Sequence, residues 1–271
     1  MKTRFLRHSA SSYASLKRHN SQFDFARRRA LRVFKSNAIY SFIPKNACST
    51  LRLSIAIDNG AIKTPDDFGW IHQNNATFSA ELADLITADY TFVVLRCPYR
   101  RLASVYLDKI VGRTGTAWQL HATLNYTIDL DEFTFTDFVK VLQNKKIRTS
   151  DIHWQEQVDF LIYEEYDDYF CLEEFEQVAS QLKQKINLNV VDARGLTKHG
   201  SDRYMILDEN EDFSTTNPLD ILFLLKKEGK YPHPKSLFTE ELRAIVEDCY
   251  KDDIKLYCSL FDPANLLFGD A

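Results

Sequence analysis

A lysine and two hydroxyl residues lie close together where a short, mostly apolar segment ends. We expect that segment, 38–43, to be a buried strand and the following 49–58 to be a helix with apolar residues at helical spacing. The first N–H groups of such a helix attract an anion, and Lys45 adds a full positive charge. The Ser49 and Thr50 hydroxyls can donate further hydrogen bonds. The pattern predicts an anion site made of Pro44, Lys45, Asn46, Ala47, Cys48, Ser49 and Thr50.

This candidate site differs from the common ATP-binding loop. The Walker A pattern GxxxxGK[ST] is absent, and no glycine occurs from 38 to 59. No carboxylate stands in an obvious place to bind magnesium. Taken alone, such a segment is more often a structural lysine followed by a serine-capped helix, so a second signal is needed before chemistry is assigned to it.

The second signal is a basic segment after the most strand-like run of the sequence. Residues 90–95 form a continuous apolar run, as expected for a parallel strand buried on both faces, and Arg96 follows at once. Pro98 suits the first turn of a helix that we expect to reach about Val111 and that carries Ser104. Arginine suits bidentate phosphate binding, although Arg96 and Ser104 reach one phosphate only if the strand end folds back on the helix. Two phosphate sites at neighbouring strand ends fit a nucleotide phosphorylated at both its 5′ and 3′ positions.

The order of elements around these two segments predicts the fold class. Strand, turn and helix occur twice in succession, which is typical of an α/β fold with a central parallel sheet flanked by helices. We expect a third strand at 169–172 and further helices at 79–86, 136–144, 151–162, 173–185, 218–227 and after Thr239. We expect mostly irregular structure at 61–78, 112–131 and 192–236.

Together the two segments resemble the sulfotransferases that use 3′-phosphoadenosine 5′-phosphosulfate (PAPS), in particular those acting on carbohydrates (sulfotransferase family 2 type). In that family a strand ends in Pro-Lys, and small and hydroxyl residues then open a helix and bind the 5′-phosphosulfate. Pro44 to Thr50 match this segment. The family's 3′-phosphate segment is Arg-Asp-Pro-aromatic-x-Arg-Leu-x-Ser, which Arg96 to Ser104 match except at Cys97, where the family has Asp. We expect this exchange to affect stability more than binding.

The resemblance covers roughly residues 38–260 and implies an α/β, P-loop-kinase-like sulfotransferase fold. The charge distribution predicts a basic N-terminal arm at 1–36, and a single domain at 37–271 is the simplest account of the rest, which contains no internal repeat or low-complexity tract. The implied reaction moves a sulfuryl group from PAPS to a hydroxyl of a carbohydrate, without a metal. Lys45 would neutralise the leaving phosphate oxygen, and Arg96 and Ser104 would bind the 3′-phosphate.

Two histidines are candidates for the acceptor side. His72 lies between the two segments, 24 residues before Arg96, and carbohydrate 2-O-sulfotransferases place a catalytic histidine in a similar interval. We therefore expect His72 to be the general base. His153, followed by Trp154, resembles a family motif that lines the acceptor side, so we expect it to bind substrate. The segment 112–131 is where we expect acceptor contacts if it is more than a surface loop, because it carries Arg113, Trp118, His121 and Tyr126.

Composition and charge limit the partners. The formal net charge of -4 argues against nucleic-acid binding by the whole chain. Residues 1–36 nevertheless contain ten Lys or Arg and one acid, which is typical of a solvated helix, a transit peptide or an arm that contacts anionic surfaces. The five cysteines lack CxxC spacing, which argues against a zinc site and fits a reducing compartment. Since no apolar stretch is long enough to span a bilayer, we expect a cytoplasmic enzyme.

Two other functions stay open at this point. An ATP-dependent small-molecule kinase of related fold would need a glycine-rich phosphate loop and a magnesium carboxylate, and neither is visible. A non-catalytic binder of 3′-phosphoadenosine 5′-phosphate would keep both anion sites without needing a base. The presence of Lys45 and His72 favours an enzyme.

Overall fold

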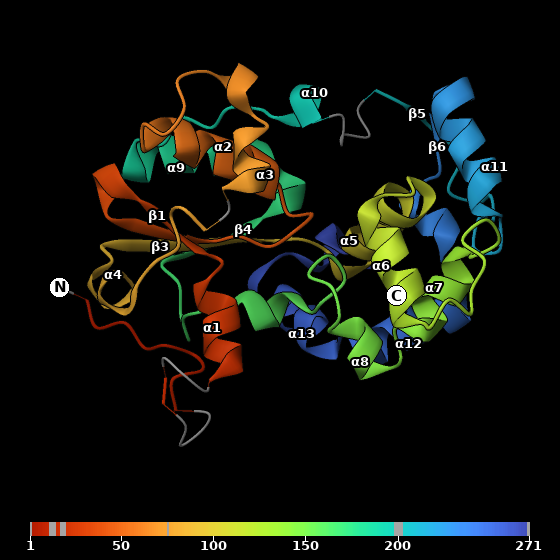
Figure 1. The fold of residues 1–271 in the computed structure, drawn as a ribbon, viewed down its shortest axis with the longest axis horizontal. Coiled ribbons are helices and arrows are strands. Elements are labelled where there is room, and N and C mark those ends of the chain that lie inside the picture. The colour runs from red at the N-terminus through yellow and green to blue at the C-terminus, as the bar shows by residue number, and fades with distance from the viewer. Residues whose placement is uncertain (1, 11–14, 17–19, 75, 198–202, 270–271) are drawn as a thin grey trace. The chain divides into compact units, whose positions relative to one another are not determined.

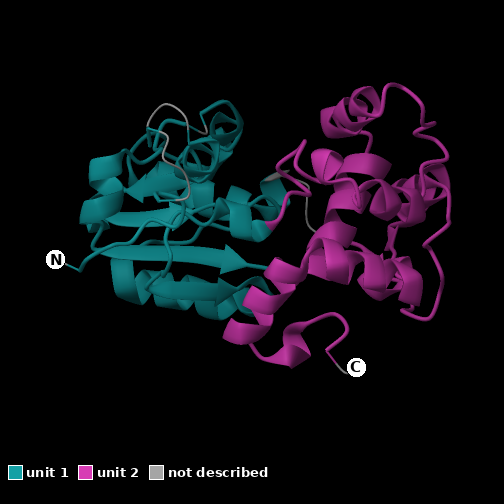
Figure 2. Cartoon of the chain, turned by 90° about the horizontal axis from the view of Figure 1, so that it is seen from below, with its two compact units in different colours: residues 1–96, 157–198 teal, residues 97–156, 199–271 magenta. Residues whose placement is uncertain are grey.

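The computed structural model describes residues 2–10, 15–16, 20–74, 76–197 and 203–269 (Figure 1). The chain folds into two compact units, each of which is made of two stretches of sequence (Figure 2). Unit 1 comprises residues 1–96 and 157–198, and unit 2 comprises residues 97–156 and 199–271. No helix in the described ranges combines the length and apolar character needed to cross a lipid bilayer.

Unit 1 is built on a sheet whose described strands follow the order β1-β2-β3-β4. These strands are β1 (Ala30–Val33), β2 (Ala38–Ser41), β3 (Tyr90–Leu95) and β4 (Asp168–Cys171). Strands β2, β3 and β4 run parallel, and β1 pairs antiparallel with β2. Strand β3 is buried from Thr91 to Leu95, as its continuous apolar sequence predicts for an inner parallel strand. The predicted α/β fold with a central parallel sheet is confirmed for β2 to β4, and β1 adds an antiparallel strand that was not predicted.

Helices α2 (Cys48–Asp58), α3 (Trp70–Gln73) and α9 (Phe175–Ile186) lie on one face of this sheet (Figure 1). Their apolar residues form one buried cluster with alternate residues of the strands, because successive strand side chains point to opposite faces. Within that cluster the ring of Phe92 stacks on Tyr40 with centroids 5.0 Å apart and meets the edge of Phe170 at 6.1 Å. The remaining helical segments of unit 1 are α1 (Ser21–Arg27), η1 (Phe34–Ser36), η2 (Pro65–Asp67), α4 (Leu82–Thr87), η4 (Gln157–Phe160), η5 (Leu172–Glu174) and α10 (Arg194–Thr197).

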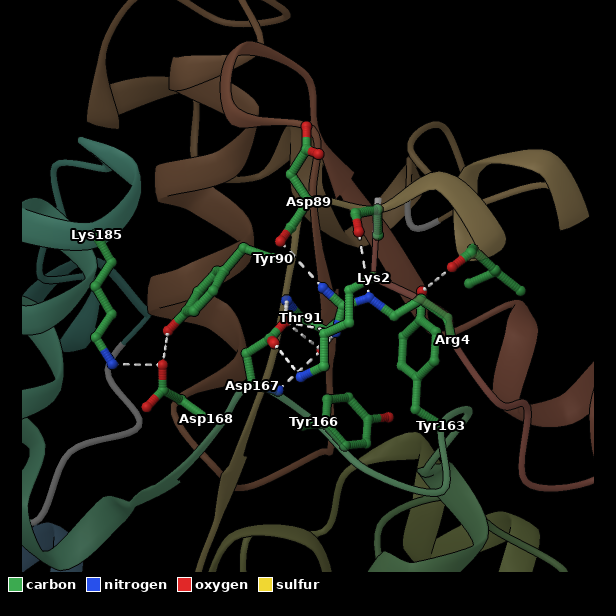
Figure 3. A network of polar contacts seen from close by, with 12 residues as sticks. Lys2, Arg4, Asp89, Tyr90, Thr91, Tyr163, Tyr166, Asp167, Asp168 and Lys185 are labelled. Carbon is green, nitrogen blue, oxygen red and sulfur yellow. Dashed lines mark hydrogen bonds and ion pairs between the residues drawn. The ribbon is translucent and has the colours of Figure 1, made fainter.

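The basic N-terminal segment is part of unit 1. It contains α1 and β1, and the stretch before them runs beside residues 162–164, where Arg7 N donates to Ile162 O at 2.9 Å. Arg4 is 7% exposed and forms an ion pair with Asp167 at 2.6 Å, and Lys2 pairs with the same carboxylate at 2.8 Å (Figure 3). Arg4 also donates to the carbonyl oxygens of Ala88 and Asp89 next to β3. The first residues described are therefore attached to the sheet by buried polar contacts.

Unit 2 consists mainly of helices around buried aromatic rings. Tyr106 contacts Phe135 with ring centroids 5.2 Å apart, and Phe138 contacts Trp154 at 5.8 Å. The helices are α5 (Pro98–Val105), η3 (Tyr106–Val111), α6 (Gly115–Thr123), α7 (Phe135–Val141), α8 (Lys145–Arg148), α11 (Pro218–Phe223), η6 (Leu224–Glu228), η7 (Pro234–Leu237), α12 (Glu240–Cys249), α13 (Lys251–Leu260) and η8 (Pro263–Asn265). The short strands β5 (Met205–Ile206) and β6 (Lys230–Tyr231) pair parallel.

Two element predictions are wrong. The expected irregular segment 112–131 contains α6, whose buried Ala117 and Leu120 are three residues apart and so lie on one helix face. The expected helix at 151–162 is a turn followed by η4. The Asp151 side chain accepts a hydrogen bond from His153 N at 2.8 Å, and such a local side-chain acceptor competes with helix formation.

Candidate active site

The loop between β2 and α2 has an unusual backbone. Lys45 and Ala47 both have positive φ angles, 72° and 54°, although neither is glycine. Such conformations cost free energy in L-residues and occur preferentially at functional sites. Loops that combine left-handed and right-handed backbone conformations direct several N–H groups to one side and form anion-binding concavities. Ala47 also offers no side-chain acceptor to the first N–H groups of α2, so the positive end of the helix has no capping side chain there.

Arg96 connects this loop to the end of β3. Its Nη1 donates to the carbonyl oxygen of Lys45 at 3.0 Å, across 51 residues of sequence. Arg96, the first residue of the second segment that the sequence singled out, therefore meets the Lys45 loop in unit 1, at the carboxyl ends of the parallel strands β2 and β3. Both Lys45 and Arg96 are partly exposed, so positive charge reaches the surface at this edge of the sheet.

Two buried amides lie beneath the loop. Asn46 is fully buried, and its Nδ2 donates to Val94 O at 2.9 Å and to Gln157 Oε1 at 2.6 Å. Gln157 also accepts a hydrogen bond from Arg96 N at 3.0 Å and donates to Arg96 O at 2.9 Å. Sequence reasoning missed Gln157, because nothing in the pattern indicates that it reaches a loop 111 residues earlier.

The hydroxyl residues at the start of α2 differ in their surroundings. Thr50 is 6% exposed, and its Oγ1 accepts a hydrogen bond from Ala193 N at 3.3 Å. One turn later, Ser54 Oγ accepts from Val191 N at 2.8 Å, so the segment before α10 runs along α2. Ser49 is partly exposed at the start of α2. Ser49 can therefore present its hydroxyl to a ligand more openly than Thr50.

Arg52 is a buried cation in the same helix. It is 9% exposed, lies over the ring of Phe42 at 5.2 Å and donates from Nη2 to Ile71 O. Burial lowers the pKa of the Arg52 guanidinium. The nearby Cys48 and Tyr40 side chains raise this pKa and so offset part of the effect of burial. Among the residues that the structure describes, no carboxylate forms an ion pair with Arg52. Its charge therefore adds to the positive potential behind the loop.

The contact between Arg52 and Ile71 also places His72. Arg52 is four residues after the start of α2, which corresponds to about 6 Å along the helix axis. The short helix α3 is therefore held beside the first turns of α2. His72 is the next residue in α3, and its side chain is exposed.

Ser104 and His153 belong to unit 2. Ser104 is partly exposed in α5, and its predicted role at the 3′-phosphate stays a prediction. His153 lies in the turn before η4, where its Nδ1 is 2.6 Å from Asp151 Oδ1. Burial raises the pKa of the Asp151 carboxyl, but hydrogen bonds and charge from His153 and the charge of Lys109 outweigh it, so the pKa lies below its ordinary value. A carboxylate that holds an imidazole in this way fixes its orientation.

Cys97 and Arg101 have structural contacts in unit 2. Cys97 is buried, and its Sγ accepts a hydrogen bond from Leu267 N at 3.3 Å. Arg101 is 3% exposed and donates to the carbonyl oxygens of Gln155 and Ile152 at 2.8 and 3.3 Å. Arg101 therefore supports the turn that carries His153.

Comparison with protein-family models decides the family. Residues 29–258 match the model of the sulfotransferase family. The chain belongs to this family. The match includes β1 to β4, the loop with Lys45, and the segments with Arg96, His72 and His153. Comparisons with curated proteins and with solved structures gave no match.

The family gives the observed geometry a chemical purpose. A sulfotransferase must bind a donor that carries an anionic sulfuryl group. In unit 1 of this sulfotransferase, a cationic loop and a helix N-terminus adjoin Arg96 at the end of β3. Lysine and arginine side chains, main-chain N–H groups and a helix dipole are the groups that bind phosphate and sulfate.

Proposed function

We propose that this sulfotransferase takes its sulfuryl group from PAPS and transfers it to a hydroxyl of a carbohydrate. The observation that carries the donor assignment is the hydrogen bond from Arg96 to the Lys45 carbonyl oxygen. This contact places Arg96 next to the loop that holds Lys45. A nucleotide with a 5′-phosphosulfate and a 3′-phosphate needs two anion-binding segments close together. Membership of the sulfotransferase family supports the same donor.

The proposed donor site divides between the two segments. The 5′-phosphosulfate is held by Lys45, by the Ser49 and Thr50 hydroxyls and by the main chain from Pro44 to Cys48. The 3′-phosphate is held by Arg96 and, through the family motif, by Ser104. Ser49 is the more exposed of the two hydroxyl residues, so we assign the direct hydroxyl contact to it first.

In the proposed mechanism the acceptor oxygen attacks sulfur in line with the bond that joins sulfur to the 5′-phosphate. That bond breaks, and the phosphate oxygen leaves with its electron pair while the base takes the proton of the acceptor hydroxyl. Lys45 stabilises the negative charge that develops on the leaving oxygen, which is the usual way an enzyme lowers such a barrier. Binding both partners in line provides the rest of the rate enhancement.

We assign the base to His72. The support is that Arg52 holds α3 beside the first turns of α2, whose N-terminus belongs to the donor loop. His153 is the rival, because Asp151 fixes its imidazole as a base requires. In the present assignment His153 binds the acceptor.

A carbohydrate acceptor is supported by exposed aromatic residues in and after α6. Trp118 is 53% and Tyr126 is 72% exposed, and His121 contacts both rings with centroids 5.9 and 5.1 Å apart. Exposed aromatic faces with polar neighbours suit the apolar face and the hydroxyls of a sugar ring.

The test offers PAPS and a panel of glycans, lipids and small phenols to the protein and identifies products by mass spectrometry. A mass increase of one sulfuryl group on a glycan supports the proposal, and sulfation of phenols alone contradicts the acceptor assignment. A parallel calorimetric titration compares 3′-phosphoadenosine 5′-phosphate with ATP and magnesium. Tighter binding of ATP would favour the kinase alternative, and bisphosphate binding without any product would favour a non-catalytic binder.

A further inference from the structure

The amide of Gln157 continues the hydrogen bonding of the sheet beyond the end of β2. Gln157 is 2% exposed, and its side chain pairs with both the N–H and the carbonyl of Arg96. Strand β2 pairs with β3 only as far as Val93, so Arg96 lies past that ladder. An amide has one acceptor and one donor group, as a peptide group has, and can replace a strand residue as the partner of a backbone.

The same amide reaches the donor loop through Asn46. Asn46 Nδ2 is shared between Gln157 Oε1 and Val94 O. Val94 and Arg96 are two residues apart, so their backbone groups point to the same edge of β3. Asn46 also lies between the two residues with positive φ, Lys45 and Ala47. The buried pair of amides therefore connects the strained part of the loop to the backbone of Arg96.

We infer that Gln157 is a positioning residue that sets the separation of the two anion-binding segments and so selects a nucleotide phosphorylated at both the 5′ and 3′ positions. This inference rests on the proposed PAPS donor. A bisphosphate contacts the Lys45 loop and Arg96 together, whereas adenosine 5′-phosphate needs the loop alone. A shift of Arg96 relative to the loop therefore weakens binding of the bisphosphate more than binding of the monophosphate, since only the bisphosphate uses the charge-assisted contact with Arg96.

The test is calorimetric titration of the intact protein with 3′-phosphoadenosine 5′-phosphate and with adenosine 5′-phosphate. Gln157→Met keeps the side-chain length but removes every hydrogen bond of the amide. We define the selectivity ratio as the dissociation constant of adenosine 5′-phosphate divided by that of 3′-phosphoadenosine 5′-phosphate. We expect this ratio to fall by about tenfold or more, mainly through weaker binding of the bisphosphate. The control, Gln177→Met, changes an exposed glutamine of α9 in the same unit and should keep the wild-type ratio.

A second variant covers the case in which Gln157→Met does not fold. Gln157→Asn keeps a buried amide but shortens it by one methylene, so it cannot reach Asn46 and Arg96 together, and the ratio should fall by roughly threefold or more. A wild-type ratio in a folded form of either variant overturns the inference, because a merely structural role changes thermal stability without changing selectivity. If the wild-type protein itself shows no preference for the bisphosphate, the proposed donor fails and the inference fails with it.

Discussion

Lys45 is the residue whose charge bears most directly on the proposed transfer. Its positive charge matters most as the leaving phosphate oxygen becomes anionic. We therefore expect Lys45→Ala to lower the turnover number by about 10²–10³ and to change PAPS affinity much less. The control is Lys63→Ala, an exposed lysine of the same unit. Steady-state rates and PAPS titration measure the two effects, and unchanged turnover in Lys45→Ala would remove this residue from the mechanism.

The two candidate bases can be separated by paired variants. His72→Ala should keep PAPS binding and thermal stability but lose turnover by roughly 10²–10⁴, and the fall in rate at acidic pH that a histidine base causes should disappear. His153→Ala should raise the acceptor KM more than it lowers kcat, because the residue is assigned to acceptor binding.

The opposite result would transfer the base role to His153. In that case Asp151→Asn should also lower kcat, since this carboxylate orients the imidazole. If both histidine variants stay active, the acceptor is acidic enough to react without a base. A phenol would then be a better candidate than a sugar.

At the scale of elements, one buried arginine adds a polar link between α2 and α3 to the apolar packing of Ile71. Arg52→Met removes the guanidinium that donates to Ile71 O and leaves that carbonyl without this partner. We expect a loss of about 1–3 kcal/mol in the free energy of unfolding, measured by urea denaturation. Amide hydrogen exchange at Ile71 and His72 should become faster, because α3 loses its polar link to α2.

The matched control for α3 is Arg28→Met. Arg28 is exposed and forms a surface ion pair with Asp24, so its removal should have little effect on stability. Equal exchange rates at His72 in the wild type and in Arg52→Met would show that other contacts hold α3. The assignment of His72 to the donor loop would then lose its structural support.

The elements whose sequence pattern matches their burial could be predicted. Strand β3 is apolar throughout and buried on both faces, and α2 follows the spacing of its apolar residues. Strand β1 was missed because Arg32 and its basic neighbours hide the alternation of the buried Leu31 and Val33. In the site, the charged residues could be predicted, whereas the link between Asn46 and Gln157 could not. A hydrogen bond between side chains 111 residues apart depends on the fold and leaves no periodic signal.

At the scale of the whole molecule, the uneven distribution of charge can be compared with the structure. The first 36 residues carry ten basic residues and one acid, a composition that resembles a solvated arm. Their described residues nevertheless include a strand of the central sheet and a buried cation, Arg4. The Arg29 guanidinium packs on the Phe25 ring, 3.7 Å from its centroid. This contact shields part of the Arg29 charge from solvent. Several of these charges therefore contribute to the fold.

Arg4 provides the test of this view, because its buried ion pair with Asp167 joins the start of the chain to β3 and β4. Arg4→Met should lower the free energy of unfolding by roughly 3 kcal/mol at pH 7. This value is at the lower end of the range for a broken buried ion pair, because Asp167 still has Lys2 as a partner. Burial raises the pKa of Asp167, but hydrogen bonds from Lys2, Arg4 and Thr91 outweigh it and hold the pKa below the ordinary value. The stabilisation is therefore present above the ordinary aspartate pKa of about 3.9 and is lost as the pH falls through the lower pKa of the folded state.

Urea denaturation at pH 7 and pH 3 measures this effect. The difference in free energy of unfolding between wild type and Arg4→Met should be smaller at pH 3 than at pH 7. The control, Arg7→Met, changes an exposed arginine and should match the wild type at both pH values. An undiminished difference at pH 3 would mean that Arg4 stabilises the fold through its carbonyl contacts and not through Asp167.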